Sequence, residues 1–176
     1  NSGHPTASSA KKEHPFYRGD SPGSEPETQA MMSLAETERF IMSMSFHTYA
    51  TRILYPYTIE NTGNPKPDYP KILTKKLVSF AKSYNPGRVY EAVKNIYPVD
   101  GTDQDFYYFK YGTIALLAES SHKNVPYDKV HYILDGFRPA WKKFLEEYRD
   151  GYKLIMKVVD EDDNPVKAEV SIEEFI

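Results

Sequence analysis

Two short, almost continuously apolar runs constrain the fold of this chain more than any other feature of its sequence. They are Phe40-Ile-Met-Ser-Met-Ser-Phe46 and Gly112-Thr-Ile-Ala-Leu-Leu-Ala118. Runs of this length between polar residues are typical of strands buried on both faces of a sheet, although the second also fits a buried helix segment. We expect two mostly buried strands, which end at His47 and Glu119.

Helical segments alternate with these runs. Three stretches have the capping chemistry or the apolar spacing of helices: about Glu25 to Glu38, Leu73 to Ser83, and Tyr127 to Tyr148. Ser24 is the expected cap of the first helix, with Pro26 in its first turn, and the third should be interrupted near Gly136 and Pro139. Strands that alternate with helices predict an α/β layered fold.

A shorter strand and two loops complete this outline. The run Arg52-Ile-Leu-Tyr55 precedes a proline, and residues 60–70 carry three further prolines, which indicates a loop. Tyr90 to Ile96 is ambiguous, and Pro98 to Asp105 is expected to be a surface loop rich in Gly and Asp. Binding residues concentrate in loops that a rigid scaffold holds, so this second loop is a candidate part of a site.

The two ends of the chain differ from its middle. Asn1 to Pro26 is polar and lacks the regions of a signal peptide, so we expect the natural protein to begin further upstream. In residues 152–176, apolar residues alternate with polar ones on both sides of a polar turn, which predicts a β-hairpin. Two strands alone are marginally stable, so this hairpin should open a further β-domain. We therefore predict one unit over residues 1–150 and the start of another over residues 151–176.

The composition excludes several classes of function. The 22 Lys and Arg residues against 25 Asp and Glu residues leave no dense basic face for nucleic acid. No apolar run approaches the ~20 residues that a membrane span needs. Zero cysteines exclude disulfides and thiolate ligands, so a metal site would have to use His, Asp or Glu.

The ends of the two apolar runs are the best candidates for a site. Side chains at strand ends can converge on a cleft, so His47 is a candidate functional residue, the alternative being a hydrogen-bonded structural histidine. An acid in apolar surroundings must be paired, protonated or metal-bound, but Glu119 also fits a solvated strand end. Tyr97 opens the loop rich in Gly and Asp, where it is either a site residue or a surface aromatic.

Seven short motifs give the chain a family resemblance. In order they are Tyr17-Arg-Gly19, Ser24-Glu-Pro-Glu-Thr28, Phe46-His-Thr-Tyr49, Leu54-Tyr-Pro-Tyr57, Ile96-Tyr-Pro-Val-Asp-Gly101, Gln104-Asp-Phe-Tyr-Tyr108 and Ala118-Glu119. Their order and spacing resemble the downstream half of the catalytic domain of zinc carboxypeptidases (the M14, carboxypeptidase A-like family) over residues 13–149. The resemblance implies the C-terminal part of a mixed-sheet α/β/α domain and hydrolysis of the C-terminal peptide bond of peptides or proteins.

The resemblance also implies roles for single residues. His47 matches a zinc ligand, Glu119 matches the general base and acid, and Tyr97 matches the tyrosine that covers the bound peptide. Gln104 matches the position that sets the preference for the C-terminal side chain, and Tyr49 lines the substrate groove in relatives.

The family places its remaining catalytic groups upstream of Asn1. These are the other two zinc ligands, in a His-x-x-Glu motif, and a carboxylate-binding arginine in an Asn-Arg pair. The complete enzyme would hold one zinc ion, whereas this chain alone should bind zinc poorly and be inactive, because a zinc site needs three or four ligands. Without the missing N-terminal half of its domain, the chain should expose a strand edge and self-associate.

The closest resemblance is to the carboxypeptidase N/E subfamily. The segment Glu119-Ser-Ser-His-Lys-Asn-Val-Pro126 and the tail Val158-Val-Asp-Glu-Asp-Asp-Asn-Pro-Val-Lys-Ala168 carry it. In that subfamily a transthyretin-like β-sandwich follows the catalytic domain, C-terminal Lys or Arg is preferred, and the proteins are secreted or lie in the cell envelope. Two functions remain as alternatives to a metallocarboxypeptidase: a non-catalytic peptide-binding pseudo-peptidase, and an amidase relative that cleaves cell-wall peptides.

Overall fold

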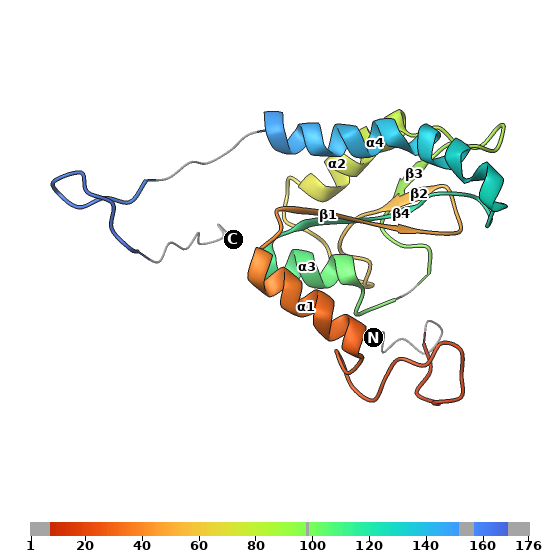
Figure 1. Ribbon diagram of the computed structural model, residues 1–176, viewed down its shortest axis with the longest axis horizontal. Coiled ribbons are helices and arrows are strands. Elements are labelled where there is room, and N and C mark those ends of the chain that lie inside the picture. Colours follow the sequence, from red (N-terminus) through yellow and green to blue (C-terminus); the bar gives the residue numbers. More distant parts are fainter. Residues whose placement is uncertain (1–7, 98, 152–156, 169–176) are drawn as a thin grey trace.

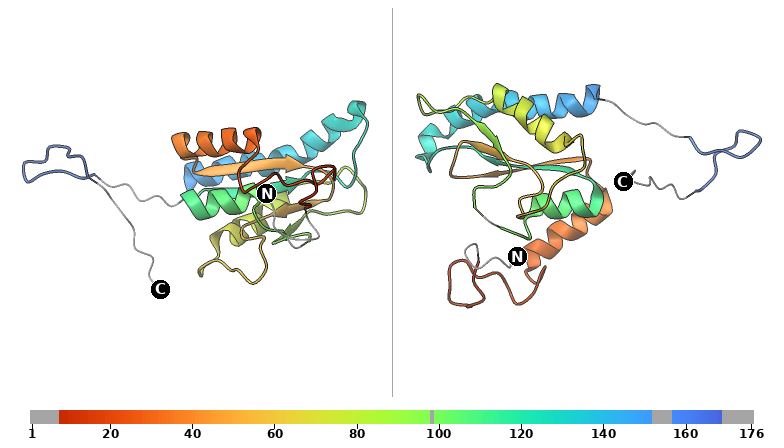
Figure 2. Two further views of the ribbon diagram at one scale, coloured as in Figure 1. Left: turned by 90° about the horizontal axis from the view of Figure 1, so that it is seen from below. Right: turned by 180° about the vertical axis from the view of Figure 1, so that it is seen from behind.

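The computed structural model describes residues 8–97, 99–151 and 157–168. The elements, in chain order, are α1 (Pro26–Glu38), β1 (Met42–His47), β2 (Arg52–Leu54), α2 (Tyr69–Leu77), η1 (Val78–Phe80), β3 (Glu91–Val93), α3 (Asp103–Tyr111), β4 (Ile114–Glu119), η2 (Tyr127–Lys129) and α4 (Val130–Asp150). Helices α2 and α4 lie on one face of the sheet, and α1 and α3 lie on the other (Figures 1 and 2). This layered arrangement confirms the predicted α/β fold class.

The sheet has four strands in the order β1-β4-β2-β3. β1 runs parallel to β4, whereas β2 runs antiparallel to β4 and parallel to β3. β4 therefore lies inside the sheet, and its apolar residues Ala115, Leu116 and Ala118 are at most 1% exposed. The predicted buried strand over 112–118 is confirmed.

The prediction of a mostly buried strand over Phe40–Phe46 is wrong in its burial. β1 is an edge strand: Met42 and Met44 are half-buried, and Phe46 is 56% exposed. An edge strand has a neighbour on one side only, so an apolar sequence by itself does not bury its residues. The outer edge of β1 has no partner strand among the described residues.

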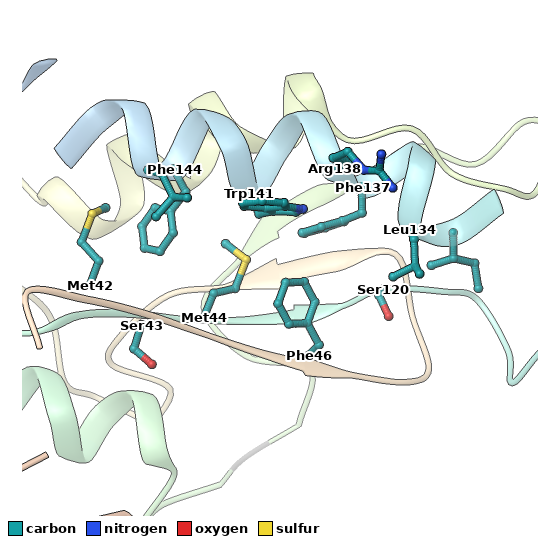
Figure 3. Close-up of a pocket in the computed structure, with 12 residues that line it drawn as sticks. Met42, Ser43, Met44, Phe46, Ser120, Leu134, Phe137, Arg138, Trp141 and Phe144 are labelled. Atoms are coloured by element: carbon teal, nitrogen blue, oxygen red, sulfur yellow. The ribbon is translucent and has the colours of Figure 1, made fainter. Parts of the chain in front are cut away.

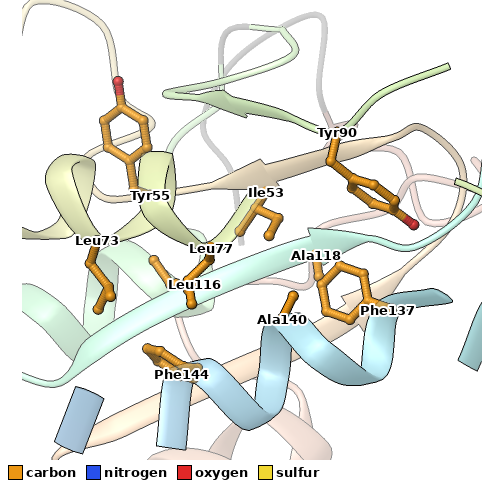
Figure 4. Close-up of a cluster of buried hydrophobic side chains, with 10 residues drawn as sticks. All are labelled: Ile53, Tyr55, Leu73, Leu77, Tyr90, Leu116, Ala118, Phe137, Ala140 and Phe144. Atoms are coloured by element: carbon orange, nitrogen blue, oxygen red, sulfur yellow. The ribbon is translucent and has the colours of Figure 1, made fainter. Parts of the chain in front are cut away.

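The main core fills the space between the sheet and the pair α2 and α4. Its central residues are Ile53 from β2, Leu77 from α2 and Leu116 from β4, each at most 1% exposed, and α4 adds Phe137 and Phe144 (Figure 4). A smaller cluster of Ala35, Tyr107 and Ala115 joins α1 and α3 to the other face. The two clusters hold β4 rigidly between layers, which positions its final residue.

The first two helices differ from expectation at their ends. Glu25, not Ser24, is the N-cap of α1, because the Ser24 hydroxyl donates a hydrogen bond to the Glu25 carboxylate instead of accepting one from the helix. α2 begins at Tyr69 rather than Leu73, since the Asp68 carboxylate caps it by accepting a hydrogen bond from the Lys71 backbone N–H. Proline is tolerated in a first helical turn, so the predicted loop over 60–70 ends before Pro70.

Helix α3 begins inside the predicted surface loop over 98–105. The Thr102 hydroxyl accepts a hydrogen bond from the Asp105 backbone N–H, and Gly112 ends the helix with a φ of 68°. A Thr cap, acidic residues in the first turn and a final glycine are helix signals. The prediction of loop up to Asp105 is therefore wrong from Asp103 onward.

Helix α4 continues through Gly136 and Pro139, where an interruption was expected. An apolar stripe that includes Phe137, Ala140 and Phe144 packs against the sheet, and this burial outweighs the ~3 kcal/mol cost of an interior proline. Gly136 also allows a close approach, since its carbonyl oxygen accepts a hydrogen bond of 2.9 Å from the Lys82 backbone N–H.

The tail has part of the predicted hairpin. Val159 and Pro165 form an antiparallel bridge, and the Asp160 backbone N–H donates a hydrogen bond of 3.0 Å to the Asn164 carbonyl oxygen. The rest of the predicted hairpin, residues 152–156 and 169–176, lies outside the described residues, so the transthyretin-like unit over 151–176 stays a prediction. None of the described helices has the length and apolar character of a membrane span.

Candidate active site

His47 and Glu119 end neighbouring parallel strands at the same level of the sheet. They are register partners, as are all five preceding pairs of β1 and β4. Directly after them, the Ser120 backbone N–H and hydroxyl donate hydrogen bonds of 2.9 and 3.0 Å to the His47 carbonyl oxygen. The residues that the sequence analysis singled out at two separate strand ends are therefore brought side by side.

Glu119 has the environment of a functional carboxylate. Its Oε2 atom is buried and has no hydrogen-bond partner among the described residues. Burial raises the pKa of the Glu119 carboxyl above its usual value, and the nearby His47 acts in the opposite direction. The carboxylate is thus held in an unsatisfied state that a proton, a cation or a water molecule would relieve.

The described residues do not by themselves form a metal site. They contain no group of three or more His, Asp or Glu residues that could hold a metal ion. His47 is exposed at its strand end and offers a single imidazole ligand, whereas protein zinc sites use three or four ligands. The residues present therefore supply only part of a zinc site.

Gln104 lies in the first turn of α3 and is 1% exposed. Its Oε1 atom is buried without a hydrogen-bond partner among the described residues. Such a group costs free energy in the folded state unless something binds to it. Gln104 is therefore a second candidate for contact with a ligand, in addition to Glu119.

The neighbouring Asp105 fixes this part of the fold. Its carboxylate accepts hydrogen bonds of 2.9 Å from the Thr58 backbone N–H, 2.8 Å from the Thr58 hydroxyl and 3.3 Å from the Ile59 backbone N–H. Burial raises the pKa of Asp105, although these hydrogen bonds favour its charged form. Asp105 thereby ties the start of α3 to the segment that follows β2.

The two candidate tyrosines lie on the surface. Tyr97 is 57% exposed in the connection between β3 and α3, and Tyr49 is 69% exposed between β1 and β2. Neither hydroxyl makes a hydrogen bond to another described residue. The structure therefore does not bring these two side chains into hydrogen-bonding contact with His47 or Glu119.

Two arginines near this site were not among the candidates predicted from the sequence. Arg52 is the register partner of Glu119 on the other side of β4, and Arg88 lines the same cavity as Arg52. The sequence offered one signal, since Arg52 opens the short run Arg52-Ile-Leu-Tyr55 that precedes a proline. The pairing of Arg52 with Glu119 depends on the register of β2 against β4, which cannot be read from the sequence.

Comparisons with known proteins agree with this arrangement. The family model for zinc carboxypeptidases matches residues 2–153. No curated protein shows significant similarity to the chain.

Solved carboxypeptidase structures share the fold. Carboxypeptidase A from Helicoverpa armigera superimposes with a TM-score of 0.73 at 15% identity, covering 86% of this chain and 41% of that chain. Bovine thrombin-activatable fibrinolysis inhibitor, solved with a tick carboxypeptidase inhibitor, gives 0.71 at 15% identity over 83% of this chain and 53% of its own. A structure of thrombin-activatable fibrinolysis inhibitor has a TM-score of 0.71 at 16% identity, covering 83% of this chain and 39% of that chain.

The chain thus spans between two fifths and about half of the length of these three structures. The likeness at this identity shows the fold, and the family match covers most of the chain. The chain belongs to the zinc carboxypeptidase family.

Proposed function

We propose that this chain is the downstream part of the catalytic domain of a metallocarboxypeptidase, an enzyme that hydrolyses the C-terminal peptide bond of peptides or proteins. One observation carries the proposal: the buried, unpartnered Oε2 of Glu119 lies level with His47 on the adjacent strand. A histidine ligand beside a desolvated carboxylate is the pairing that metal-assisted hydrolysis needs. Family membership supports the same reaction.

In this proposal Glu119 moves the proton. The carboxylate takes a proton from the attacking water and delivers it to the leaving amine, so that hydroxide adds to the carbonyl carbon and the peptide C–N bond breaks. A general base works best when its pKa lies near the operating pH, and burial moves the pKa of Glu119 upward from the usual acidic range.

His47 would be one ligand of a single zinc ion. Bound zinc lowers the pKa of a coordinated water toward ~7. The other two ligands would come from residues outside this chain, as the family resemblance implies. We therefore expect the chain alone to bind zinc poorly and to be inactive.

The substrate would meet three further residues. Gln104 would accept a hydrogen bond from a C-terminal Lys or Arg side chain through its unpartnered Oε1. Tyr97 would cover the C-terminal residue, and Tyr49 would line the groove for the preceding residues. Their exposure leaves both rings free to contact a peptide.

The N-terminal half of the same domain is the partner that we propose for the apolar face at β1. A groove of about 520 Å³ lies between β1 and α4 (Figure 3), and it is lined mostly by apolar side chains such as Met44, Phe46, Trp141 and Phe144. An unpaired strand edge beside such a groove favours association, so the chain without that half should self-associate. By family relation we also propose a secreted or cell-envelope location.

Substitution of Glu119 in the full-length protein tests the proposal. Glu119→Gln keeps the shape of the side chain but cannot take a proton, so kcat with zinc present should fall by 10²–10⁴-fold while the protein stays folded. Glu38→Gln is the matched control, because Glu38 is an exposed acid at the end of α1 and lies in no part of the proposed site. Peptides ending in Arg, Phe and Glu give the side-chain preference, for which we expect Arg to be cleaved fastest.

The result that would contradict the proposal is equal zinc-dependent hydrolysis by the wild-type protein and Glu119→Gln. A protein that binds peptides without hydrolysing them would instead be a peptide-binding pseudo-peptidase. Hydrolysis of cell-wall peptides at an amide bond, without cleavage of ordinary C-terminal residues, would indicate the amidase alternative.

A further inference from the structure

A second cavity lies at the start of β2, where Arg52 is the register partner of Glu119. It measures about 530 Å³, and its lining includes Tyr49, Thr51, Arg52, Arg88, Glu91 and His122. We call it the arginine pocket. Its residues come from the β1–β2 connection, from the segment before β3, from the segment after β4, and from the first residues of β2 and β3, which are Arg52 and Glu91.

The arginine pocket carries more positive than negative charge. Its lining contains two arginines, Arg52 and Arg88, and a single acidic residue, Glu91. The Arg52 Nε and Glu91 Oε2 atoms are 3.6 Å apart, which is an ion pair but too long for a hydrogen bond. This local balance contrasts with the net charge of −3 of the whole chain.

The guanidinium N–H groups of both arginines are available to a ligand. Arg88 makes no ion pair and donates no side-chain hydrogen bond to any described residue, and Arg52 has only its ion pair with Glu91. The backbone beneath them is fixed, since the Glu91 N–H donates a hydrogen bond of 3.1 Å to the Thr51 carbonyl oxygen. Two arginines with free donors in one cavity suit a carboxylate, which accepts two parallel N–H hydrogen bonds from a guanidinium.

The sheet register places this pocket relative to the reacting group. Arg52 is level with Glu119, and both are level with Glu91 on the outer strand. Gln104 lies toward the opposite end of β2 from Arg52. The carboxylate of its neighbour Asp105 accepts a hydrogen bond from the Thr58 hydroxyl, and Thr58 lies beyond the last residue of β2. A peptide with its C-terminal side chain at Gln104 and its last peptide bond at Glu119 would therefore direct its preceding residues toward the start of β2.

We propose that the arginine pocket binds an acidic side chain of the peptide substrate, on a residue that precedes the cleaved C-terminal residue. The inference rests on the proposed function and adds a substrate preference to it. The enzyme would select its substrate at two positions with opposite charge. A C-terminal Lys or Arg side chain would bind at Gln104, and an Asp or Glu upstream of it would bind at Arg52 and Arg88.

Paired peptides test this preference in the full-length protein. The peptides are identical except for Glu or Gln at the second, third or fourth position from the C-terminus, and kcat/KM is measured for each. At one position at least, the Glu peptide should be cleaved about fivefold faster than its Gln partner, the size expected of a solvent-accessible ion pair. The ratio should shrink as salt screens the charges.

Variants assign the preference to the pocket. The ratio of Glu to Gln peptide should fall to about one in Arg88→Gln and in Arg52→Gln. Lys75→Gln removes an equal charge from the exposed surface of α2 and should keep the wild-type ratio. Equal rates for Glu and Gln peptides at all three positions, or a wild-type ratio in both arginine variants, would overturn the proposal.

Failure of the proposed function would be recognised separately. If the protein hydrolyses none of the peptides, the binding of the same peptides is measured by fluorescence anisotropy. Tighter binding of a Glu peptide that Arg88→Gln removes would still support the arginine pocket, and equal affinities for the Glu and Gln peptides would refute it.

Discussion

Replacing Gln104 by Leu should make the protein more stable and less selective at the same time. Gln104 is 1% exposed and its Oε1 is unpartnered, and a buried polar group without a hydrogen bond costs ~1–3 kcal/mol. Leucine has a similar volume and no polar atom. We therefore expect Gln104→Leu to raise the free energy of unfolding by about 1 kcal/mol.

The loss of selectivity follows from the same atom. A hydrogen bond from a charged donor contributes ~1.5–3 kcal/mol. If Oε1 accepts such a bond from a substrate Lys or Arg, its removal should lower kcat/KM for an Arg-terminated peptide by about 10- to 100-fold. Cleavage of a Leu-terminated peptide should change little, because that side chain offers no donor.

The assay combines urea unfolding with kcat/KM for peptides ending in Arg, Leu and Glu, using the full-length protein with zinc. Gln29→Leu is the control, since Gln29 is the other glutamine of the chain and is exposed on α1. Destabilisation of Gln104→Leu by 1 kcal/mol or more would mean that Oε1 is satisfied within the protein. An unchanged ratio of Arg to Leu peptide would mean that Oε1 does not contact the substrate side chain.

Three further predictions concern stability and assembly. Glu147→Gln should lose about 1 kcal/mol in urea unfolding at neutral pH. The loss should vanish in acid, because Lys76 at 2.6 Å, aided by Lys143, lowers the pKa of Glu147 and its contribution disappears as pH falls through that value. Gly136→Ala should cost about 2 kcal/mol, since a Cβ there would lie 2.4 Å from the Lys82 carbonyl oxygen, whereas Gly63→Ala meets no atom within 4 Å and should melt like the wild type. This chain on its own should form oligomers in light scattering, and a monodisperse monomer would contradict the proposed role of the groove at β1.

Several elements were predictable because their signal is local. The run over 112–118 predicted β4, since almost every residue in it is apolar, and the spacing of Leu73 and Leu77 predicted a helix with one buried face. Glu119 was a candidate because a carboxylate directly after a buried apolar strand loses part of its contact with water when the strand packs into the fold. Its raised pKa agrees with that expectation.

Other features escaped sequence reasoning because they depend on what surrounds a segment. β1 has the composition of a buried strand, yet its position at the sheet edge leaves Phe46 largely exposed. Pro139 has the local chemistry of a helix break, yet packing of α4 on the sheet keeps the helix continuous. The start of α3 was assigned to a loop although Thr102 is a good cap, because Gly and Asp residues are common in both.

The sequence by itself determined the fold class, the family motifs and the two strand-end residues His47 and Glu119. These follow from local periodicity and from residue identity, which do not depend on distant neighbours. Only the tertiary structure decided that these two residues share one register level, that Gln104 is buried with an unsatisfied oxygen, and that Arg52 and Arg88 line one cavity. Register and burial arise from contacts between segments tens of residues apart, and the physical properties of a site, its desolvation and its charge, come from those contacts.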